Sequence, residues 1–361
     1  MSYRISNEQE TRRSPKKSMR DRKKTSKARR VFQVFFTLIL VFAVGAVAAS
    51  NFLPTLQRVE YAKDDESLGI QENTNLNVEN EEVKTYLEEK EKVENILLIG
   101  VDGEGYTGVR SDVMMILSIS ETRGMSLTSI QRDTLLYNPT TDALDKMGHN
   151  FAYGSAAATL KAINMNLDLD IRDFVAFDFN ALKLLVDVIG GVEVDVDQAE
   201  LKDMAVSGVT LRSTGVQKLN GEEALIYARV RYNSGGDTGR NARQREILKY
   251  VFKEAKSLSY GQLYEMAMKV LPAVQTSYGY SDVPVMLKMY QGMKGSGDFE
   301  EYSFPFDQKE GTLKGTYYAV PNTLSSNVVK LHNQLFQFDD YSPSDTVEGI
   351  NRKIGNFSGF Y

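Results

Sequence analysis

The feature that most constrains this chain is an uncharged apolar segment, residues 31–53, which contains no Asp, Glu, Lys, Arg or His. At ~1.5 Å per residue, a helix of this length can cross a hydrocarbon core of ~30 Å. A buried core helix is the alternative reading. The length and the strongly one-sided flanking charge favour a transmembrane helix.

The charge lies on the N-terminal side of this segment. Residues 1–30 carry twelve Lys or Arg against three Asp or Glu, whereas the whole chain has a net charge of −5. The positive-inside rule therefore predicts a single-pass cell-membrane protein with residues 1–30 as a cytoplasmic tail and everything after residue 53 extracellular. Residues 46–48, Ala-Val-Ala, resemble a signal-peptidase site, but the charged leader is long for a signal peptide. We expect an uncleaved signal anchor at 31–53, and a tail that sets topology and contacts anionic lipid rather than nucleic acid.

The chain has no cysteine. Disulfides, thiolate catalysis and Cys-ligated zinc are therefore excluded, and stability must come from burial.

Downstream of the anchor, residues 54–94 are rich in Asn and Glu and predict an extracellular stalk with some helix near its end. From residue 95 to 340, strand and helix signals alternate, which predicts one α/β domain with a central mixed β-sheet flanked by helices. Residues 341–361 are assigned to a C-terminal tail. The predicted strands are 95–101, 113–120, 125–130, 174–179 and 192–196, and the predicted helices are 151–167, 181–189, 221–228, one from about 240 to 258, and weaker ones at 260–274 and 281–293.

A glycine-rich stretch, residues 103–108, matches the pattern G-x-G-x-x-G directly after the first strand. In a dinucleotide site the last glycine opens a helix that holds the pyrophosphate. Here Gly108 leads into a second predicted strand, and Asp102 stands where a bare carboxylate would repel phosphate. We therefore reject the nucleotide reading.

Two carboxylates, Asp102 and Asp112, flank this loop. They are either ordinary turn residues or ligands of a divalent cation that lies between them and a phosphate, because hard oxygen ligands suit Mg²⁺ or Mn²⁺.

Arginines favour the phosphate reading, because guanidinium groups match phosphate oxygens bidentately and stabilise charge that develops on cleavage. Arg240 and Gln244, four residues apart, would share one face of the long helix. The arginines that follow predicted strand or helix ends, or open the long helix, are Arg110, Arg132, Arg229, Arg231, Arg240, Arg243 and Arg245.

Several ordered motifs together resemble the LytR-CpsA-Psr family. The segments that carry the resemblance are 95–102 (NILLIGVD), 110–115 (RSDVMM), 129–134 (SIQRDT), 146–154 (KMGHNFAYG), 190–192 (GGV), 219–231 (LNGEEALIYARVR) and 237–245 (DTGRNARQR). The likeness covers about residues 95–258, and a membrane-anchored, cysteine-free layout fits it.

The resemblance implies an α/β/α domain that holds a polyprenyl-pyrophosphate lipid in a hydrophobic pocket. It also implies a phosphotransferase that moves a phosphate-linked glycopolymer, such as teichoic acid or capsule, from this lipid carrier onto peptidoglycan in Gram-positive walls. The implied partners are the lipid-linked glycan donor, the peptidoglycan acceptor and the membrane, with no nucleic acid.

The resemblance also implies roles for residues. Asp102 and Asp112 would lie at the Mg²⁺ and acceptor side, and Lys146 would assist. Pyrophosphate contacts would come from Arg132, Arg229, Arg231, Arg240 and Gln244, and the converging arginines add Arg110 and Arg243. Two departures stand out: Gln131 replaces a common proline, and Gly148 and Phe151 interrupt a tighter Asn-His-Ala-Tyr pattern.

The expected reaction is attack of an acceptor hydroxyl on the glycan-side phosphorus, with the lipid phosphate leaving. Asp102 or Asp133 is the candidate general base, with Asp133 alternatively orienting Arg132. His149 and His332 are expected in loop or packing roles. The apolar stripe Phe174, Phe177, Phe179, Leu182 and Leu185 is either plain core or part of a lipid slot.

Two other functions remain open on the sequence alone. A hydrolase would cleave the same pyrophosphate without transfer. A regulator would use the basic arm on DNA, but thirty residues without an apolar period cannot form a reading domain.

Overall fold

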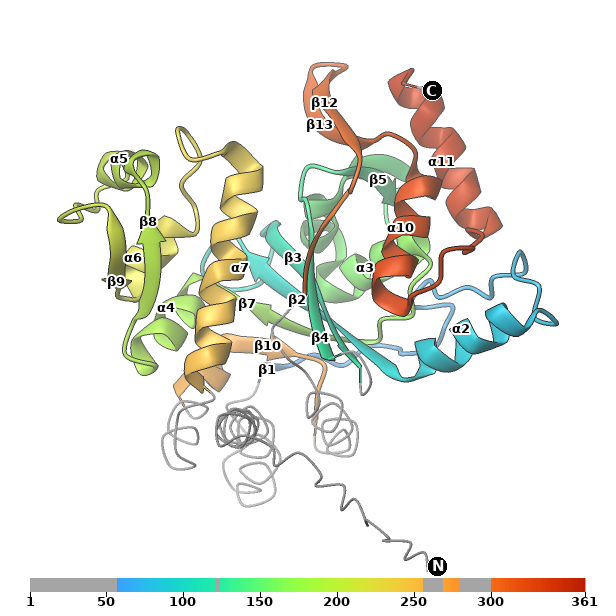
Figure 1. Cartoon of the computed structure of the whole chain (residues 1–361), viewed down its shortest axis with the longest axis horizontal. Helices are drawn as coiled ribbons and strands as arrows, with labels where there is room; N and C mark the ends of the chain where they lie inside the picture. The colour runs from blue at the N-terminus through green and yellow to red at the C-terminus, as the bar shows by residue number, and fades with distance from the viewer. Residues whose placement is uncertain (1–56, 121–123, 256–268, 280–299, 361) are drawn as a thin grey trace, which may run out of the picture.

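A central seven-stranded mixed sheet organises the domain in the computed structural model, which describes residues 57–120, 124–255, 269–279 and 300–360 (Figure 1). The strand order is β1-β10-β7-β2-β3-β4-β11. The strands are β1 (Gln57–Arg58), β2 (Val93–Val101), β3 (Ser111–Ser120), β4 (Gly124–Ile130), β7 (Asp173–Phe177), β10 (Val274–Thr276) and β11 (Glu300–Phe304). The predicted transmembrane segment and basic tail lie outside the described residues. Among the residues that are described, no helix combines the length and apolar composition that a membrane crossing needs.

The centre of the sheet follows directly from the apolar runs in the sequence. β2 pairs antiparallel with β3, and β3 with β4, whereas β2–β7 and β4–β11 are parallel. β2, β4, β7 and β11 therefore end at the same edge of the sheet, where β3 begins. The predicted mixed α/β architecture is confirmed, and this edge carries the residues that the motifs singled out.

One face of the sheet carries the main core. Leu97 and Ile99 of β2 and Ile116 of β3 are fully buried there against helices. The helices on this side are α2 (Glu81–Glu91), α3 (Asn150–Leu167), α10 (Leu324–Phe336) and α11 (Asp345–Ser358), as Figure 1 shows. Alternate residues of the same strand, such as Ile96 and Leu98, face the opposite side, as the two-residue period of a strand requires.

A second group of elements lies on that opposite side and has its own core. It comprises α4 (Phe179–Val188), β8 (Val192–Val196), α5 (Gln198–Val206), β9 (Gly215–Leu219), α6 (Gly221–Tyr227) and α7 (Gly236–Ala255). Val186, Val194, Tyr227 and Ile247 are buried together in it. α7 links this group to the sheet, because its Arg245 donates to Ser129 of β4. We refer to these elements as the α4–α7 lobe.

Two hairpins form small sheets separate from the seven-stranded sheet. β5 (Leu135–Asn138) pairs with β6 (Ala143–Lys146), and β12 (Gln308–Leu313) pairs with β13 (Thr316–Pro321). Two 3₁₀ turns, η2 (Met147–His149) and η3 (Leu271–Ala273), precede α3 and β10. The two weaker helices expected at 260–274 and 281–293 fall mostly or wholly outside the described residues. In the described part of the first, residues 271–274 are η3 and the start of β10 rather than continuous helix.

The structure corrects both predicted domain boundaries. Residues 57–94, assigned to a stalk, contribute β1 to the sheet and bury Leu68, Val83 and Tyr86 in the main core. Residues 341–361, assigned to a tail, include α11, whose Ile350 and Ile354 are buried in the same core. Both segments are rich in polar residues, so their few core contacts at helical spacing did not stand out.

Candidate functional site

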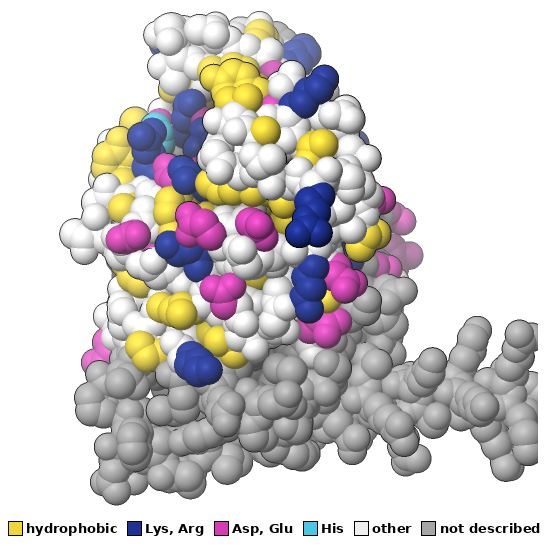
Figure 2. All heavy atoms as spheres, turned by 90° about the vertical axis from the view of Figure 1, so that its left-hand side faces the viewer, with side chains coloured by type: hydrophobic (Ala, Val, Ile, Leu, Met, Phe, Trp, Pro, Cys, Tyr) yellow, Lys and Arg dark blue, Asp and Glu magenta, His cyan; other side chains and the backbone are white. Residues whose placement is uncertain are grey.

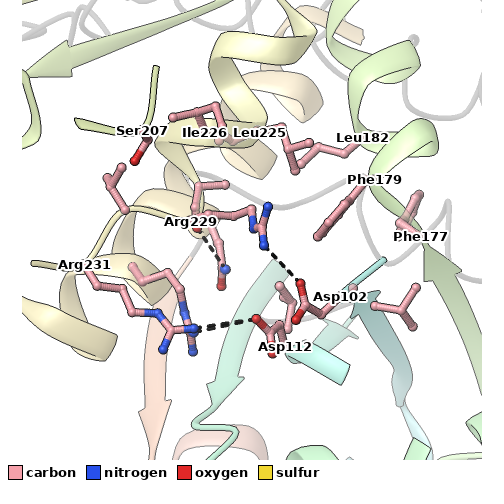
Figure 3. Close-up of a pocket in the computed structure, with 18 of the residues that line it drawn as sticks. Asp102, Asp112, Phe177, Phe179, Leu182, Ser207, Leu225, Ile226, Arg229 and Arg231 are labelled. Atoms are coloured by element: carbon pink, nitrogen blue, oxygen red, sulfur yellow. Dashed lines mark hydrogen bonds and ion pairs between the residues drawn. The ribbon is translucent and has the colours of Figure 1, made fainter. Parts of the chain in front are cut away.

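A cavity of about 790 Å³ lies between the end of β2, the start of β3 and the α4–α7 lobe (Figure 3). Its lining is divided by chemistry. Apolar side chains from β2, α4, α6 and α7 form most of it, including Leu98, Leu182, Leu185, Leu225, Ile226 and Ile247. Charged and polar side chains, including Asp102, Asp112, Arg229, Arg231, Arg240 and Gln244, complete it.

The two carboxylates are placed by the glycine loop. Asp102 follows β2, Asp112 is the second residue of β3, and the antiparallel pairing of these strands makes the stretch between them a hairpin connection. Gly105 and Gly108 have φ values of 83° and 69°, in the left-handed region that favours glycine. No helix follows Gly108, so the structure confirms the rejection of a dinucleotide turn.

Asp112 is the point where the arginines converge. Its Oδ1 lies 2.6 Å from Nη1 of Arg132, and its Oδ2 lies 3.7 Å from Nη2 of Arg231 and 3.9 Å from Nη1 of Arg240. These arginines come from the segment after β4, the segment after α6 and the second turn of α7. Three guanidinium groups around one carboxylate leave a surplus of positive charge, which suits a polyanionic ligand.

Arg240 is the most buried of these cations, with 1% of its side chain exposed. Gln244, one turn further along α7, lines the same cavity and donates from Nε2 to the carbonyl of Ala228 at 3.2 Å. The predicted shared face of the long helix is therefore confirmed. The Oε1 of Gln244 is buried and has no hydrogen-bond partner among the described residues, and a buried acceptor of this kind is costly unless something occupies it.

Arg229 forms a more exposed ion pair where the cavity opens to solvent, a region that we call its mouth. Its Nη2 lies 3.3 Å from Oδ1 of Asp102, and its guanidinium lies 4.5 Å from the ring centroid of Phe179. Figure 3 shows Arg229 pointing toward Asp102, and Arg231 toward Asp112. The Arg229 and Asp102 side chains are 47% and 38% exposed, so the pair is worth at most about 1 kcal/mol and can yield to a ligand.

Asp133 extends this network away from the cavity. Its Oδ1 lies 2.6 Å from Nζ of Lys146, and its Oδ2 accepts from Nε of Arg132 at 3.2 Å. Burial alone would raise the pKa of the Asp133 carboxyl, but hydrogen bonding and charge from Lys146 and Arg132 outweigh it, so the pKa lies below its usual value. Neither Arg132, Asp133 nor Lys146 lines the cavity.

Besides Arg132 and Lys146, two further predicted phosphate ligands, Arg110 and Arg243, do not line the cavity. Arg110 is exposed and is not among the residues that line the cavity. Arg243 is 3% exposed and donates to Glu200 at 3.2 Å and to the carbonyls of Tyr227, Val230 and Ser234. Its donors are used to clamp the segment that carries Arg229 and Arg231, which corrects the expectation that it binds phosphate directly. Arg245 likewise turns away, toward Glu301 and Ser129.

The apolar stripe from Phe174 to Leu185 was predicted to be either plain core or part of a lipid slot, and its residues divide between the two. Phe174 is fully buried in the main core, whereas Phe177, Phe179, Leu182 and Leu185 line the cavity. Other apolar cavity residues, such as Val206 of α5 and Leu225 and Ile226 of α6, were not predicted as part of the site. Their apolar spacing is the same as that of core residues, so no sequence signal separated them.

The two histidines lie outside the cavity lining. His149 contacts Asp145 at 3.0 Å, and His332 is completely buried beside Tyr86 and Tyr341. Their expected loop and packing roles agree with these positions.

Seen from the α5–β9 side, basic side chains are spread over the described surface, several of them at the upper left, above a band of hydrophobic and acidic side chains (Figure 2). Among the described residues, no group of three or more His, Cys, Asp or Glu is arranged to hold a metal ion. Of the four aspartates that line the cavity, Asp178 and Asp203 accept hydrogen bonds from neighbouring backbone N–H groups, whereas Asp102 and Asp112 face the arginines and could contribute to a cation site. Mg²⁺ often uses only one or two carboxylates and completes its shell with phosphate and water. The residues fit that mode of binding.

Comparison with known proteins adds the family. A sequence model of the LytR_cpsA_psr family matches residues 58–335. The chain is 29% identical over 325 residues to the polyisoprenyl-teichoic acid–peptidoglycan teichoic acid transferase TagV of Bacillus subtilis strain 168, covering 88% of this chain and 80% of TagV. It is 27% identical over 277 residues to the transferase TagU of Enterococcus faecalis strain V583, covering 75% of this chain and 86% of TagU.

A solved structure agrees with these relatives. The crystal structure of B. subtilis TagV matches with a TM-score of 0.55 and 27% identity, covering 70% of this chain and 99% of that one. The family match spans both the sheet edge and the α4–α7 lobe that enclose the cavity. The chain therefore belongs to the LytR-CpsA-Psr family.

Proposed function

We propose that this protein is a phosphotransferase that moves a phosphate-linked glycopolymer from a polyprenyl-pyrophosphate carrier onto peptidoglycan. The observation that carries the proposal is the divided cavity, apolar over most of its lining and cationic where Arg229, Arg231 and Arg240 enter it. A lipid pyrophosphate has the same division, because its tail is apolar and its head group is anionic. The relatives TagV and TagU, named as teichoic acid transferases, support the same donor and acceptor classes.

Arg231, Arg240 and Gln244 would hold the pyrophosphate, with Arg229 released from Asp102 to contact it. An acceptor hydroxyl then forms a bond to the glycan-side phosphorus while the bond from that phosphorus to the oxygen of the lipid phosphate breaks. Charge spreads over the phosphoryl oxygens and the leaving group in this step. Guanidinium groups already fixed in place stabilise that charge without reorganisation.

Geometry favours Asp102 over Asp133 as the group that accepts the hydroxyl proton. Both oxygens of Asp133 face cations, Lys146 and Arg132, which hold the pKa of that carboxyl low and weaken it as a base. Asp102 lies at the open mouth with Arg229 on one oxygen. Asp133 then orients Arg132, which in turn contacts Asp112.

A divalent cation, Mg²⁺ or Mn²⁺, would be held by Asp112 and phosphate oxygens, with Asp102 as a second ligand in the alternative in which Asp102 is not the base. When bound, it would neutralise charge on the pyrophosphate. Its support here is the chemistry of the donor set, two carboxylates beside the converging arginines.

The cellular location is part of the proposal. The basic residues 1–30 and the uncharged residues 31–53 favour a signal anchor that holds the domain outside the cell membrane, where peptidoglycan is found.

Substitution of Arg229 or Arg240 by Ala tests the function. Either change should abolish attachment of a radiolabelled polyprenyl-pyrophosphate-linked glycan to peptidoglycan in vitro, since loss of one preorganised donor to a developing charge costs about 10²–10³ in rate. Arg212→Ala, an exposed arginine outside the cavity lining, is the matched control and should transfer normally.

Two outcomes would contradict the proposal. Near-normal transfer by both the Arg229→Ala and the Arg240→Ala variant would show that the protein is not this phosphotransferase. Accumulation of free glycan phosphate instead of wall-linked polymer would identify a pyrophosphate hydrolase.

A further inference from the structure

The ion pairs among Asp112, Arg132, Asp133 and Lys146 form a charged network. The β12–β13 hairpin lies beside the Asp133 end of this network. The backbone N–H of Ala319 in β13 donates to the carbonyl of Asp133 at 2.9 Å, and Ala319 forms a bridge with Thr134. The base of the hairpin is therefore attached to the chain segment that carries Arg132 and Asp133. Figure 1 shows the hairpin extending from this edge of the sheet.

A tyrosine on this hairpin is exposed but held in place. Tyr317 is 39% exposed, and its hydroxyl donates to Oε2 of Glu310 at 2.6 Å. The other oxygen of Glu310 accepts from Gln308 at 2.9 Å and from Gln131 at 3.4 Å. Gln131 is the residue that departs from the usual proline, and proline has no side-chain donor for this contact. An exposed aromatic ring whose orientation is fixed loses little entropy when it binds a partner.

Lys146 connects this ring to the charged network. Its Nζ lies 2.6 Å from Oδ1 of Asp133, 5.9 Å from the ring centroid of Tyr317 and 5.8 Å from that of Tyr318. The ring is thus two side chains away from Arg132, which contacts Asp112 at the cavity.

The in-line geometry of the proposed reaction predicts the side of the phosphate from which the acceptor approaches. In phosphoryl transfer the attacking and leaving oxygens are roughly in line with the phosphorus. If the lipid phosphate leaves into the cavity, the acceptor hydroxyl must approach from the other side of the phosphate. Asp102, the proposed base, and Asp112 lie where the cavity opens, whereas Arg132, Asp133, Lys146 and Tyr317 do not line it. The network therefore leads from the opening, where the hydroxyl would attack, to the hairpin.

We propose that Tyr317, Glu310, Gln131 and Lys146 form an acceptor platform that binds a sugar ring of the acceptor glycan. The aromatic ring would pack against the C–H face of the sugar, and the exposed Glu310 carboxylate and the partly exposed Lys146 ammonium would hydrogen-bond its hydroxyls. The buried Gln131 amide would hold Glu310 in position. The exposed carboxylate of Glu310 disfavours a second phosphate here, so the occupant is a glycan rather than the donor. This inference rests on the proposed function for the direction of transfer.

Binding of the glycan by itself tests the platform without any transfer. A tetrasaccharide fragment of the peptidoglycan glycan strand is titrated into the detergent-solubilised full chain by calorimetry. Tyr317→Ala should weaken binding about tenfold, the size of one lost aromatic contact. Tyr317→Phe, which keeps the ring, should stay within about threefold of the unsubstituted protein.

Tyr302→Ala is the control, because Tyr302 is a half-buried tyrosine on β11 whose hydroxyl also donates to a glutamate, Glu300, at 2.7 Å. It should bind the tetrasaccharide normally. In transfer assays, Tyr317→Ala should raise the KM for acceptor about tenfold and leave the KM for the lipid-linked donor within about twofold.

The outcomes separate the two proposals. Transfer with an unchanged acceptor KM and unchanged glycan binding in Tyr317→Ala overturns the platform and leaves the phosphotransferase standing. Tetrasaccharide binding that needs Tyr317, in a protein that transfers nothing, supports the platform and overturns the proposed function. A rise in the donor KM equal to that for acceptor assigns Tyr317 to donor binding and also overturns the platform.

Discussion

At the residue scale, burial separates arginines that the sequence presents as equivalent. Arg229 is 47% exposed and paired with an exposed carboxylate, whereas Arg240 is 1% exposed within reach of Asp112. Arg243 is as buried as Arg240 but donates to backbone carbonyls of its own neighbourhood. The sequence correctly indicated a cationic cluster, but it could not rank its members, because the ranking depends on which donors the protein itself consumes.

His332 makes a prediction about stability that is independent of the cavity. Its Nδ1 lies 2.9 Å from the Tyr86 hydroxyl, its Nε2 lies 2.9 Å from the carbonyl of Leu167, and burial lowers its pKa from 6.5 to about 3. Between about pH 6.5 and pH 3, His332 therefore binds a proton in the unfolded chain but not in the folded chain. The free energy of unfolding should fall as the pH drops below about 6.5, by up to about 1.4 kcal/mol per pH unit.

Urea titrations between pH 7.5 and 5, above the range in which most carboxyls titrate, measure this slope. His332→Gln should be less stable at pH 7.5 but should show a shallower slope. His149→Gln, which changes a half-buried histidine, should keep the slope of the unsubstituted protein. Equal slopes for all three proteins would show that His332 does not control the pH dependence.

At the scale of elements, the strands of the sheet centre were predicted within a few residues, whereas β1 and α11, at the two ends of the domain, were missed. β2 and β3 are nearly continuous apolar runs, a pattern that depends only on local sequence. α11 is a polar helix with one narrow buried stripe, and it follows the end of the family match at residue 335. Its place in the core depends on α10 and α3, against which it packs.

Ile354 of α11 tests whether this segment belongs to the folding unit. It is fully buried in the main core, so Ile354→Ala should lower the free energy of unfolding by about 2–5 kcal/mol, measured as a lower urea midpoint with an unchanged m value. Arg352→Ala, an exposed change on the same helix, should alter it by less than about 0.5 kcal/mol. An unchanged midpoint for Ile354→Ala would show that residues 341–361 do not contribute to the stability of the domain.

At the scale of the whole molecule, the cavity exists because the α4–α7 lobe does not seal against the sheet. Phe179, Leu182 and Leu185 follow one face of α4 along the cavity. Leu185 lies ~9 Å along the helix axis from Phe179, the ring beneath Arg229 at the mouth. The far end of α4 is therefore where a lipid tail, rather than its head group, would contact the protein.

Leu185→Trp should consequently discriminate between donors by tail length. We expect it to raise the KM for a long polyprenyl donor about tenfold, because the indole fills space that the tail needs, and to leave a short-chain donor within about twofold. Leu184→Trp is the control, since Leu184 is 39% exposed and does not line the cavity. Equal losses for long and short donors would place the tail elsewhere.

The sequence by itself determined the central strands, the hairpin reading of the glycine loop and the residues at the sheet edge, because strand runs, turn glycines and motif spacing are local properties. Only the tertiary structure decided that Phe174 is core while Phe177 and Leu185 line a cavity, that Arg243 braces a segment rather than facing the mouth, and that residues 57–94 and α11 belong to the domain. Each of these depends on which partner a side chain meets across the fold. Arg132 and Asp112 lie 20 residues apart, and Arg229 and Asp102 lie 127 apart; no local pattern encodes such a meeting.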